Sequence, residues 1–385
     1  MLERGLEIEV LTGKPNYPWG KIFEGYRAWG CQKEIYRDIR INRIPLWPRG
    51  RGGWRLALNY LSFVVFGLLF SPWMLRKKKF DVIFVYAPSP ILQVIPAIFI
   101  GWLKGCPVVV WVQDLWPESL SATGYVSNRA ILKGIESVVR YIYRHTDLIL
   151  VTSKAFEGPV RGLAPNTPIA YYPNSVDDTF ARPPSLKPPE VDGLIDGFSI
   201  MFAGNIGTAQ AVGVIVEAAT LLRKHEDIHF VVLGDGSCRE WMMREVRHRG
   251  LSNVHLPGRF PVEMMPGFMQ KASVLLVTLA DRPIFAATIP NKIQAYMAAG
   301  RPIIACLNGE GARLVVEANA GLVTPAEDAQ ALASKIMHLY NQSSDVLVEM
   351  GNNGRAYYKA NFDHGHLITQ LISHFQGMQK KEENS

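Results

Sequence analysis

Short apolar segments rich in β-branched residues alternate with longer helical stretches from one end of the chain to the other. This alternation is typical of parallel sheets whose strands are joined by helices. A chain of 385 residues has room for two domains of that kind. The sequence therefore predicts an α/β protein of two Rossmann-like domains, with strands near residues 7–11, 81–86, 107–112, 147–151 and 169–172 in the first half and 199–202, 229–233, 254–256, 274–278 and 302–306 in the second.

A proline-rich stretch at residues 181–190 separates the two sets of strands. Proline fits neither a helix interior nor a central strand, so we place the domain boundary near residue 190. The expected domains are then residues 1–190 and 191–385. Residues 351–379 alternate aromatic and polar residues as amphipathic helices do, and a polar tail follows them.

A basic, apolar segment at residues 49–79 interrupts the first domain. Its centre, residues 56–75, carries no charged side chain and would form a helix about 30 Å long, enough to span a bilayer. Polar residues and a proline dilute the run, so three interpretations stay open: a span, a helix at the membrane interface, or a buried helix. The flanking cations favour an anionic membrane face over a nucleic-acid groove; they are Arg49, Arg51, Arg55, Arg76, Lys77, Lys78 and Lys79.

The four cysteines lie far apart and show neither disulfide nor zinc-site spacing. No cleavable signal peptide is visible at Met1, so we expect a cytoplasmic protein with reduced thiols. A net charge of +7 suits a protein that meets phosphates or an anionic membrane face. The absence of Walker, HxE and HExxH motifs argues against an NTPase, a deaminase or a zinc hydrolase.

Two loops of the second domain have the composition of phosphate-binding loops. The strand at 199–202 leads into Gly204, Asn205 and Gly207, followed by a helix; glycines at such a turn let the backbone approach a phosphate at the helix N-terminus. The same pattern is often purely structural. Another glycine pair, Gly234 and Gly236, follows the strand at 229–233, and we interpret it as a simple turn.

A second phosphate contact is predicted in residues 288–302. Pro290 suits the first turn of a helix and Gly300 its end. Lys292 then lies in the first turn, where its cation can reach an anion held by Asn291 and its neighbours. The alternative is a solvated Lys292 without a ligand.

Two carboxylates in the first domain, Asp114 and Glu118, directly follow the apolar strand at 107–112. Parallel sheets bind ligands at the carboxyl ends of their strands, so both are candidates for acceptor binding or proton transfer. Each also has a structural interpretation, Asp114 as a helix N-cap and Glu118 as a first-turn helix residue.

In order along the chain, four motifs resemble family 4 of the retaining GT-B glycosyltransferases. They are HTDLILVTS (145–153), YPNSVDDTF (172–180, with Ser175 in place of glycine), FAGN (202–205) and YMAAGRP (296–302). Finer details resemble a branch that builds bacterial surface polysaccharides, including N-acetyl-L-fucosamine transferases and colanic-acid-type transferases: LTGKPNYP (11–18), DLWPES (114–119) and NGEGA (308–312).

The resemblance implies a GT-B fold with two Rossmann-like domains facing a cleft. Domain 1–190 would bind the acceptor and domain 191–385 the nucleotide sugar, with the last helix returning to the first domain. The donor would be UDP-linked, with the uracil near Arg259 and Phe260 and the diphosphate between the 204–207 loop and Lys292. The acceptor would be a polyprenyl-diphosphate-linked saccharide of O-antigen, capsule or exopolysaccharide synthesis, at the inner membrane face. No metal, other cofactor or nucleic acid is expected.

Two departures from the family pattern concern the donor site. The paired glutamates of the family fall at Ala287 and Ala295, and Asn205 stands in place of the donor-loop arginine. The diphosphate would then depend on Lys292 and Arg259. A third departure is at the start, where residues 2–10 resemble the end of a first helix running into a second strand, so the first βα unit of the fold is expected to be missing. Two other functions remain open: a catalytically inactive binding subunit and a UDP-sugar 2-epimerase.

Overall fold

The computed structural model describes all residues except 18, 19, 28, 51, 123–125, 127, 177, 183, 185 and 383–385. Arg51 of the basic segment, Asp177 of the 172–180 motif, and Pro183 and Ser185 of the expected linker lie outside the described residues. The chain divides into two compact units, one formed by Met1–Tyr172 with Gln370–Ser385 and the other by Pro173–Thr369. The division therefore lies after Tyr172, and the proline-rich stretch belongs to the second unit rather than ending the first.

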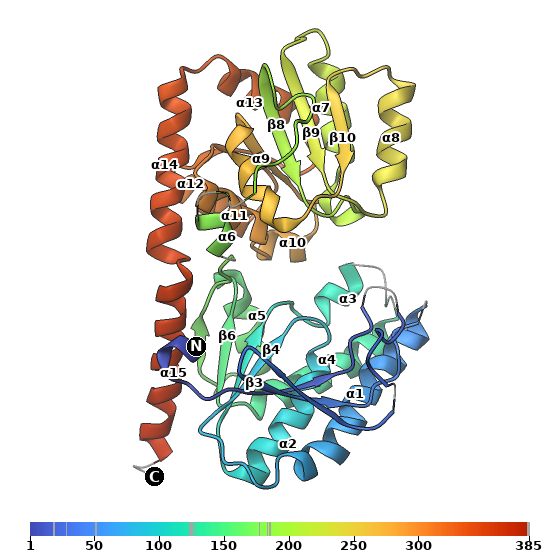
Figure 1. Ribbon diagram of the computed structural model, residues 1–385, viewed down its shortest axis with the longest axis vertical. Coiled ribbons are helices and arrows are strands. Elements are labelled where there is room, and N and C mark those ends of the chain that lie inside the picture. The colour runs from blue at the N-terminus through green and yellow to red at the C-terminus, as the bar shows by residue number, and fades with distance from the viewer. Residues whose placement is uncertain are drawn as a thin grey trace. The chain divides into compact units, whose positions relative to one another are not determined.

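The second unit contains a six-stranded parallel sheet in the order β10-β9-β8-β11-β12-β13. This is the doubly wound order, in which the chain starts at the centre with β8, builds outward through β9 and β10, then reverses to β11. Figure 1 shows β8, β9 and β10 of this sheet side by side. The strands are β8 (Phe198–Ala203), β9 (Ile228–Leu233), β10 (Val254–Gly258), β11 (Val274–Thr278), β12 (Ile303–Cys306) and β13 (Gly321–Thr324). Of these, β13 was not expected from the sequence.

Alternate residues of the central strand β8 enter opposite layers of the core. Ile200 and Phe202 pack in one cluster with residues of α7 (Gly213–Leu221) and α13 (Ala329–Tyr340). Met201 and Ala203 pack in the other, with residues of α9 (Met265–Lys271), α11 (Asn291–Ala299) and α14 (Ser344–Asn361). Because both faces are covered, the central strands β8, β9 and β11 are mostly apolar and buried. The remaining helices of this unit are α6 (Asp178–Ala181), α8 (Arg239–His248), α10 (Pro283–Ala287) and α12 (Glu310–Glu317).

The first unit holds two sheets. Four parallel strands follow one another in the order β4-β5-β6-β7, with bounds Ile83–Ala87, Val108–Val112, Leu148–Val151 and Ile169–Tyr171. A separate three-stranded sheet, β1-β3-β2, contains β1 (Glu9–Gly13), β2 (Gln32–Tyr36) and β3 (Ile39–Ile44). The chain enters β1 from a single 3-10 turn, Leu2–Arg4. Its helices include α3 (Glu118–Ala122), α4 (Arg129–Arg144) and α5 (Glu157–Leu163), and α15 (His364–Glu382) ends in this unit.

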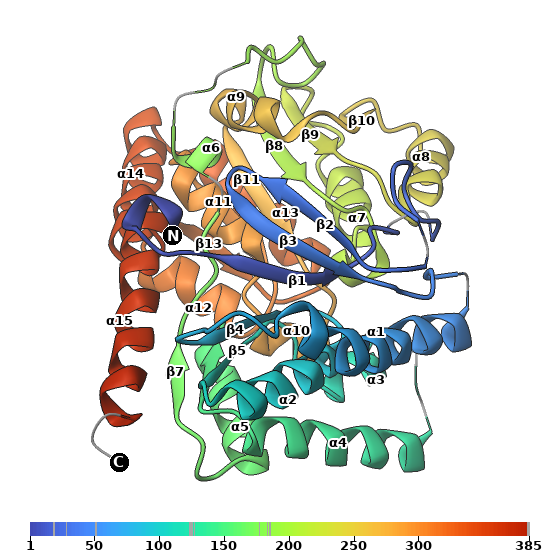
Figure 2. The ribbon, with the colours of Figure 1, turned by 60° about the horizontal axis from the view of Figure 1, so that its bottom comes forward.

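The apolar run forms α1 (Gly53–Met74), which lies beside α2 (Val94–Lys104) (Figure 2). Gly67 permits this close approach, because a Cβ there would lie 2.6 Å from Cγ of Pro96. Beyond α1, Lys104 donates hydrogen bonds to the carbonyl oxygens of Leu75 and Lys78, at 2.8 and 2.9 Å. One face of α1 is therefore packed on the folded unit along its length.

Candidate functional site

The reversal of strand order in the second unit lies between β8 and β11, which pair directly. Open α/β sheets bind ligands beyond the carboxyl ends of the strands at such a reversal. The chain leaves β8 there through Gly204, and β11 ends at Thr278. The helix α11 begins at Asn291 and packs against β11. The geometry therefore points to this edge of the sheet as the candidate site.

Three glycine loops meet at this edge. The amide of Gly204 donates to the carbonyl of Leu233 at 2.9 Å, and that of Gly234 donates to the carbonyl of Gly258 at 2.8 Å. A Cβ at Gly234 would lie 1.8 Å from the Gly204 oxygen, and Gly234 has φ 142°. Gly234 is thus more than the simple turn expected from the sequence, because it lets the loops after β8 and β9 pack in contact.

Lys292 reaches back from α11 to the end of β8. Its Nζ lies 3.5 Å from the ring centroid of Phe202, and a Cβ added at Gly204 would lie 2.6 Å from its Cε. The ammonium nitrogen is buried and has no hydrogen-bond partner among the described residues. Burial lowers the pKa of Lys292 to about 7. A cation held this way gains most from an anion that supplies the missing hydrogen bonds.

The other predicted donor residues lie at the same edge of the sheet, but not all of them approach Lys292. The amide of Asn205 donates to Gln210 Oε1 at 3.0 Å, and Asn291 Oδ1 accepts from Asn174 Nδ2 at 3.0 Å. Gly207 begins the turn that precedes α7. Arg259 is exposed directly after β10, two strands from β8 at the same edge of the sheet, and no contact with Lys292 is found. The ring of Phe260 packs against Phe268, with 4.8 Å between the ring centroids, so Phe260 is partly buried against the hydrophobic core.

Sequence reasoning missed two supporting residues at this site, Gln294 and Tyr296. Gln294 donates to the Asn174 carbonyl at 3.0 Å, while its Oε1 is buried without a partner among the described residues. The Tyr296 hydroxyl accepts the amide of Ala203 at 3.0 Å, which fixes the end of β8. Only the helical spacing of Lys292 and Tyr296, one turn apart in α11, could have indicated a shared face.

The two carboxylates that the sequence predicts for the acceptor, Asp114 and Glu118, lie in the first unit after β5. Asp114 is partly buried, and burial raises the pKa of its carboxyl group. Glu118 is exposed and starts α3, as its structural interpretation predicts. The same loop buries Gln113 Nε2 and Trp116 Nε1 without partners in the described part of the chain. No group of three or more His, Cys, Asp or Glu side chains among the described residues is placed to hold a metal ion.

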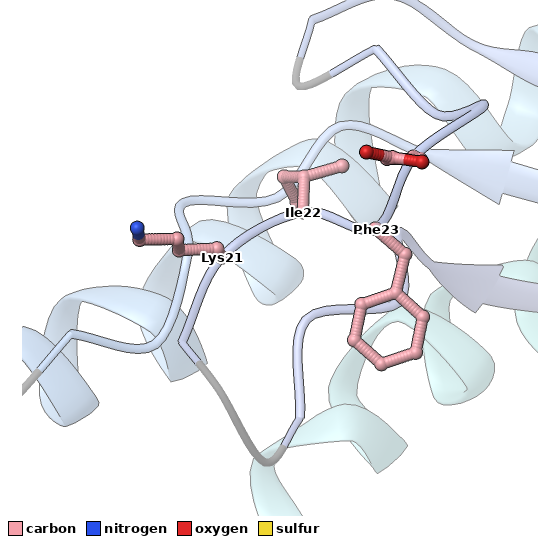
Figure 3. A pocket seen from close by; sticks show the side chains of 4 residues that line it. Lys21, Ile22 and Phe23 are labelled. Carbon is pink, nitrogen blue, oxygen red and sulfur yellow. The ribbon is translucent and has the colours of Figure 1, made fainter.

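A shallow hollow in the first unit is formed by the consecutive residues Lys21, Ile22, Phe23 and Glu24 (Figure 3). These side chains come from one loop and do not converge on a point, so we assign no chemistry to this hollow.

Comparison with known proteins agrees with this architecture. Residues 1–175 match the family described as "Glycosyl transferase 4-like domain", and residues 197–342 match "Glycosyl transferases group 1". The "Putative colanic acid biosynthesis glycosyl transferase WcaI" of Escherichia coli (strain K12) is 23% identical over 77% of this chain and 74% of its own length. The "Probable glycosyltransferase WbjE" of Pseudomonas aeruginosa is 25% identical over 79% and 75%.

Solved structures share the fold. A UDP-forming α,α-trehalose-phosphate synthase from Burkholderia xenovorans superposes with a TM-score of 0.73 at 12% identity, covering 97% of this chain and 99% of that one. The Anabaena protein HepE, solved with UDP and glucose, gives 0.63 at 15% identity over 88% and 86%. Several relatives are named for the biosynthesis of colanic acid or amylovoran. The chain is therefore a glycosyltransferase of the GT-B fold, with a carboxy-terminal domain of glycosyl transferases group 1.

Proposed function

We propose that this enzyme transfers a sugar, with retention, from a UDP-linked donor to a polyprenyl-diphosphate-linked saccharide at the cytoplasmic face of the membrane, during O-antigen, capsule or exopolysaccharide synthesis. The observation that carries the donor half is the buried ammonium of Lys292, which has no partner among the described residues and lies beside Gly204 at the strand reversal. The names of the relatives support the pathway. N-acetyl-L-fucosamine is the donor sugar that the sequence resemblance suggests.

In this proposal the diphosphate contacts Lys292 and the first turn of α11, where the helix dipole also favours negative charge. Arg259 would approach the nucleotide from the end of β10, next to Phe260. As the glycosidic bond to the diphosphate breaks, Lys292 stabilises the charge that develops on the leaving oxygen. Asp114 would accept a hydrogen bond from the acceptor hydroxyl, and Glu118, the first residue of α3, would lie nearby in the same loop. No resident metal is part of this mechanism.

Titration calorimetry with UDP tests the donor assignment. Loss of a charge-assisted hydrogen bond costs about 1.5 to 3 kcal/mol, so Lys292→Ala and Arg259→Ala should each weaken UDP binding by about tenfold to a hundredfold. Lys271→Ala, on the exposed end of α9, is the matched control and should change affinity less than about twofold. Unchanged affinity in Lys292→Ala would show that the diphosphate lies elsewhere.

The acceptor half rests on the exposed surface of α1 and α2. Leu61, Val65, Leu69 and Trp73 recur every fourth residue of α1 and are at least half exposed, and Trp102 of α2 is 77% exposed. Among the described residues, α1 is the one helix that is long and apolar enough to cross a membrane. Its opposite face is packed against α2 and β3. A helix that crosses the membrane would lose these packing contacts. We therefore favour an interfacial helix that holds the enzyme where lipid-linked acceptors are found.

Transfer itself is measured with radiolabelled UDP-sugars and a polyprenyl-diphosphate saccharide in vesicles. Labelled lipid-linked product with the α-configuration for an α-linked donor is expected, and excess EDTA should leave the rate unchanged. UDP binding without any transfer across the common UDP-sugars would instead favour the inactive binding subunit.

A further inference from the structure

A cavity of about 410 Å³ lies in the first unit at the carboxyl ends of β1 and β3. It is lined by the segment from Thr12 to Tyr17, by Arg43 and Leu46 after β3, and by Asn59, Tyr60 and Phe63 of α1. Pro90 and Gln93 complete the wall. All of these residues belong to one compact unit, and none is part of the donor site. The cavity contains most of the LTGKPNYP motif, to which the donor chemistry gives no role.

Lys14 is the unusual residue of this wall. It is 2% exposed, and its Nζ donates to the neutral Oε1 of Gln32 at 3.0 Å. No ion pair joins it to a carboxylate in the described part of the chain. Burial lowers the pKa of the Lys14 ammonium and Arg43 lowers it further, while Cys31 and Glu34 act in the opposite direction. A buried ammonium without a counter-charge is costly, and an anion in the cavity would offset that cost.

The second cation of the wall is already neutralised. Arg43 pairs with Glu34 at 2.6 Å and donates to the Gly13 carbonyl at 3.1 Å. Its guanidinium also lies 4.9 Å from the ring centroid of Tyr26. The cavity therefore presents one ammonium without an ion-pair partner among the described residues, at Lys14, rather than the multiple cations that a diphosphate usually meets.

The rest of the lining suits a sugar ring. Tyr17, Tyr60 and Phe63 offer aromatic surface, and the amide side chains of Asn59 and Gln93 line the same cavity. Asn59 Nδ2 donates a hydrogen bond to the Trp47 carbonyl, and Gln93 Nε2 donates one to the Tyr86 carbonyl at 3.0 Å. These hydrogen bonds orient both amide groups. Apolar walls with a few oriented polar groups are typical of small-molecule sites, and amides bind hydroxyl groups well.

We propose that this cavity binds an acceptor saccharide that carries an anionic substituent, such as a phosphate or a carboxylate, with Lys14 in contact with the anion. The inference rests on the proposed function in one respect, namely that the bound saccharide is the acceptor. Lys14 would select the acceptor by its charge, and the aromatic and amide groups would select the ring.

Ligand-observed NMR and calorimetry with glucose 1-phosphate, glucose and inorganic phosphate test the site, each with and without saturating UDP to occupy the donor site. Glucose 1-phosphate should bind with UDP present, more tightly than either glucose or phosphate. Lys14→Met, which keeps the side-chain length and removes the charge, should weaken that binding at least tenfold. Lys33→Met, on the exposed side of β2, is the matched control and should leave it within about twofold.

Gln93→Glu is a second variant on the cavity wall, and its carboxylate should repel the anion and weaken binding of glucose 1-phosphate in a folded protein. Equal affinity in wild type and Lys14→Met would overturn the proposal, and so would phosphate binding as tightly as glucose 1-phosphate, since the ring would then contribute nothing. UDP affinity separates the acceptor cavity proposed here from the donor site at Lys292. If glucose 1-phosphate fails to bind while Lys14→Met still binds UDP as wild type does, only the cavity proposal is wrong. If the wild-type protein does not bind UDP, only the donor assignment is wrong.

Discussion

Lys292 combines three properties that seldom occur together in a surface lysine. Its ammonium is buried, it faces the ring of Phe202, and it has no hydrogen-bond partner among the described residues. The cation–π contact compensates only part of the lost hydration. Because Gly204 has no side chain, the ammonium can lie against the backbone at the end of β8. The backbone at Gly204 and the ammonium of Lys292 therefore lie next to each other at the end of β8.

The titration of Lys292 gives UDP binding a distinctive pH dependence. The lysine of the free protein is about half charged at pH 7, because burial lowers its pKa to about 7. A bound diphosphate raises that pKa, so binding above pH 7 requires proton uptake and weakens as pH rises. We expect UDP affinity to fall about tenfold between pH 7 and 8.5, measured by calorimetry in buffers of different ionisation enthalpy.

Lys292→Met is the control for this pH effect. The terminal phosphate of UDP is ionised throughout that range, since its pKa is about 6. The variant should therefore bind weakly but with a flat profile from pH 7 to 8.5. A slope that persists in Lys292→Met would assign the proton to another group.

Residue types and spacing predicted part of this environment. Glycines after the strand at 199–202 and a lysine in the first turn of a helix indicated a phosphate site, and the strand reversal brings the two together. What the sequence could not indicate is that Lys292 lacks a counter-charge while Arg43 has one. Ion pairing depends on side chains from distant segments, such as Glu34 on the neighbouring strand of Arg43.

At the scale of elements, α1 has two faces with different neighbours. Asn59, Gly67, Ser71 and Met74 are buried against the unit, whereas Leu61, Val65 and Leu69 are exposed. The cations Arg55, Arg76, Lys77 and Lys79 are exposed, but Lys78 pairs with Glu9 at 3.2 Å. Lys78 should therefore contribute less to an anionic membrane surface than its neighbours, which the sequence pattern alone does not distinguish.

Replacing Leu61, Val65 and Leu69 together by glutamine should strongly reduce binding to vesicles that contain anionic lipid. Full burial of such a side chain contributes about 1.5 to 3 kcal/mol, so partial burial of three predicts a loss of at least tenfold in vesicle cosedimentation. Val316→Gln, at a 60% exposed valine on α12, is the control and should bind as wild type does. Wild-type binding by the triple variant would place the membrane contact on another surface.

The hairpin of β2 and β3 is the element that sequence reasoning missed most clearly. Its turn residues, Arg37 and Asp38, both adopt positive φ, at 46° and 67°, where glycine or asparagine is the usual signal. Its strand β2 begins with three polar residues in a row and only β3 approaches alternation, and β2 pairs antiparallel to β3 in an otherwise parallel protein. The turn carries no glycine or asparagine and few side chains of these strands are buried. The sequence pattern of this segment therefore cannot be distinguished from that of a loop.

At the scale of the whole molecule, the two proposed binding sites use separate sets of side chains. Every described contact of Lys292 lies within the second unit, and every described contact of Lys14 lies within the first. Mutations that share no partner usually have additive effects on free energy. The proposed acceptor and donor sites should therefore be separable in kinetics, although both are needed for transfer.

We predict that Lys14→Met raises the KM for an anionic lipid-linked acceptor, whereas Lys292→Ala raises the KM for the UDP-sugar and also lowers kcat. In the proposed complex Lys292 touches the leaving group, so its loss affects the transition state, while Lys14 contacts a part of the acceptor that does not react. In the double variant the two losses in kcat/KM should multiply to within about threefold, as expected for independent sites. Steady-state assays at varied donor and acceptor concentrations measure all three variants. A double variant no worse than Lys292→Ala alone would mean that both lysines serve one ligand, and the cavity beside Lys14 would then have to be reassigned to the donor.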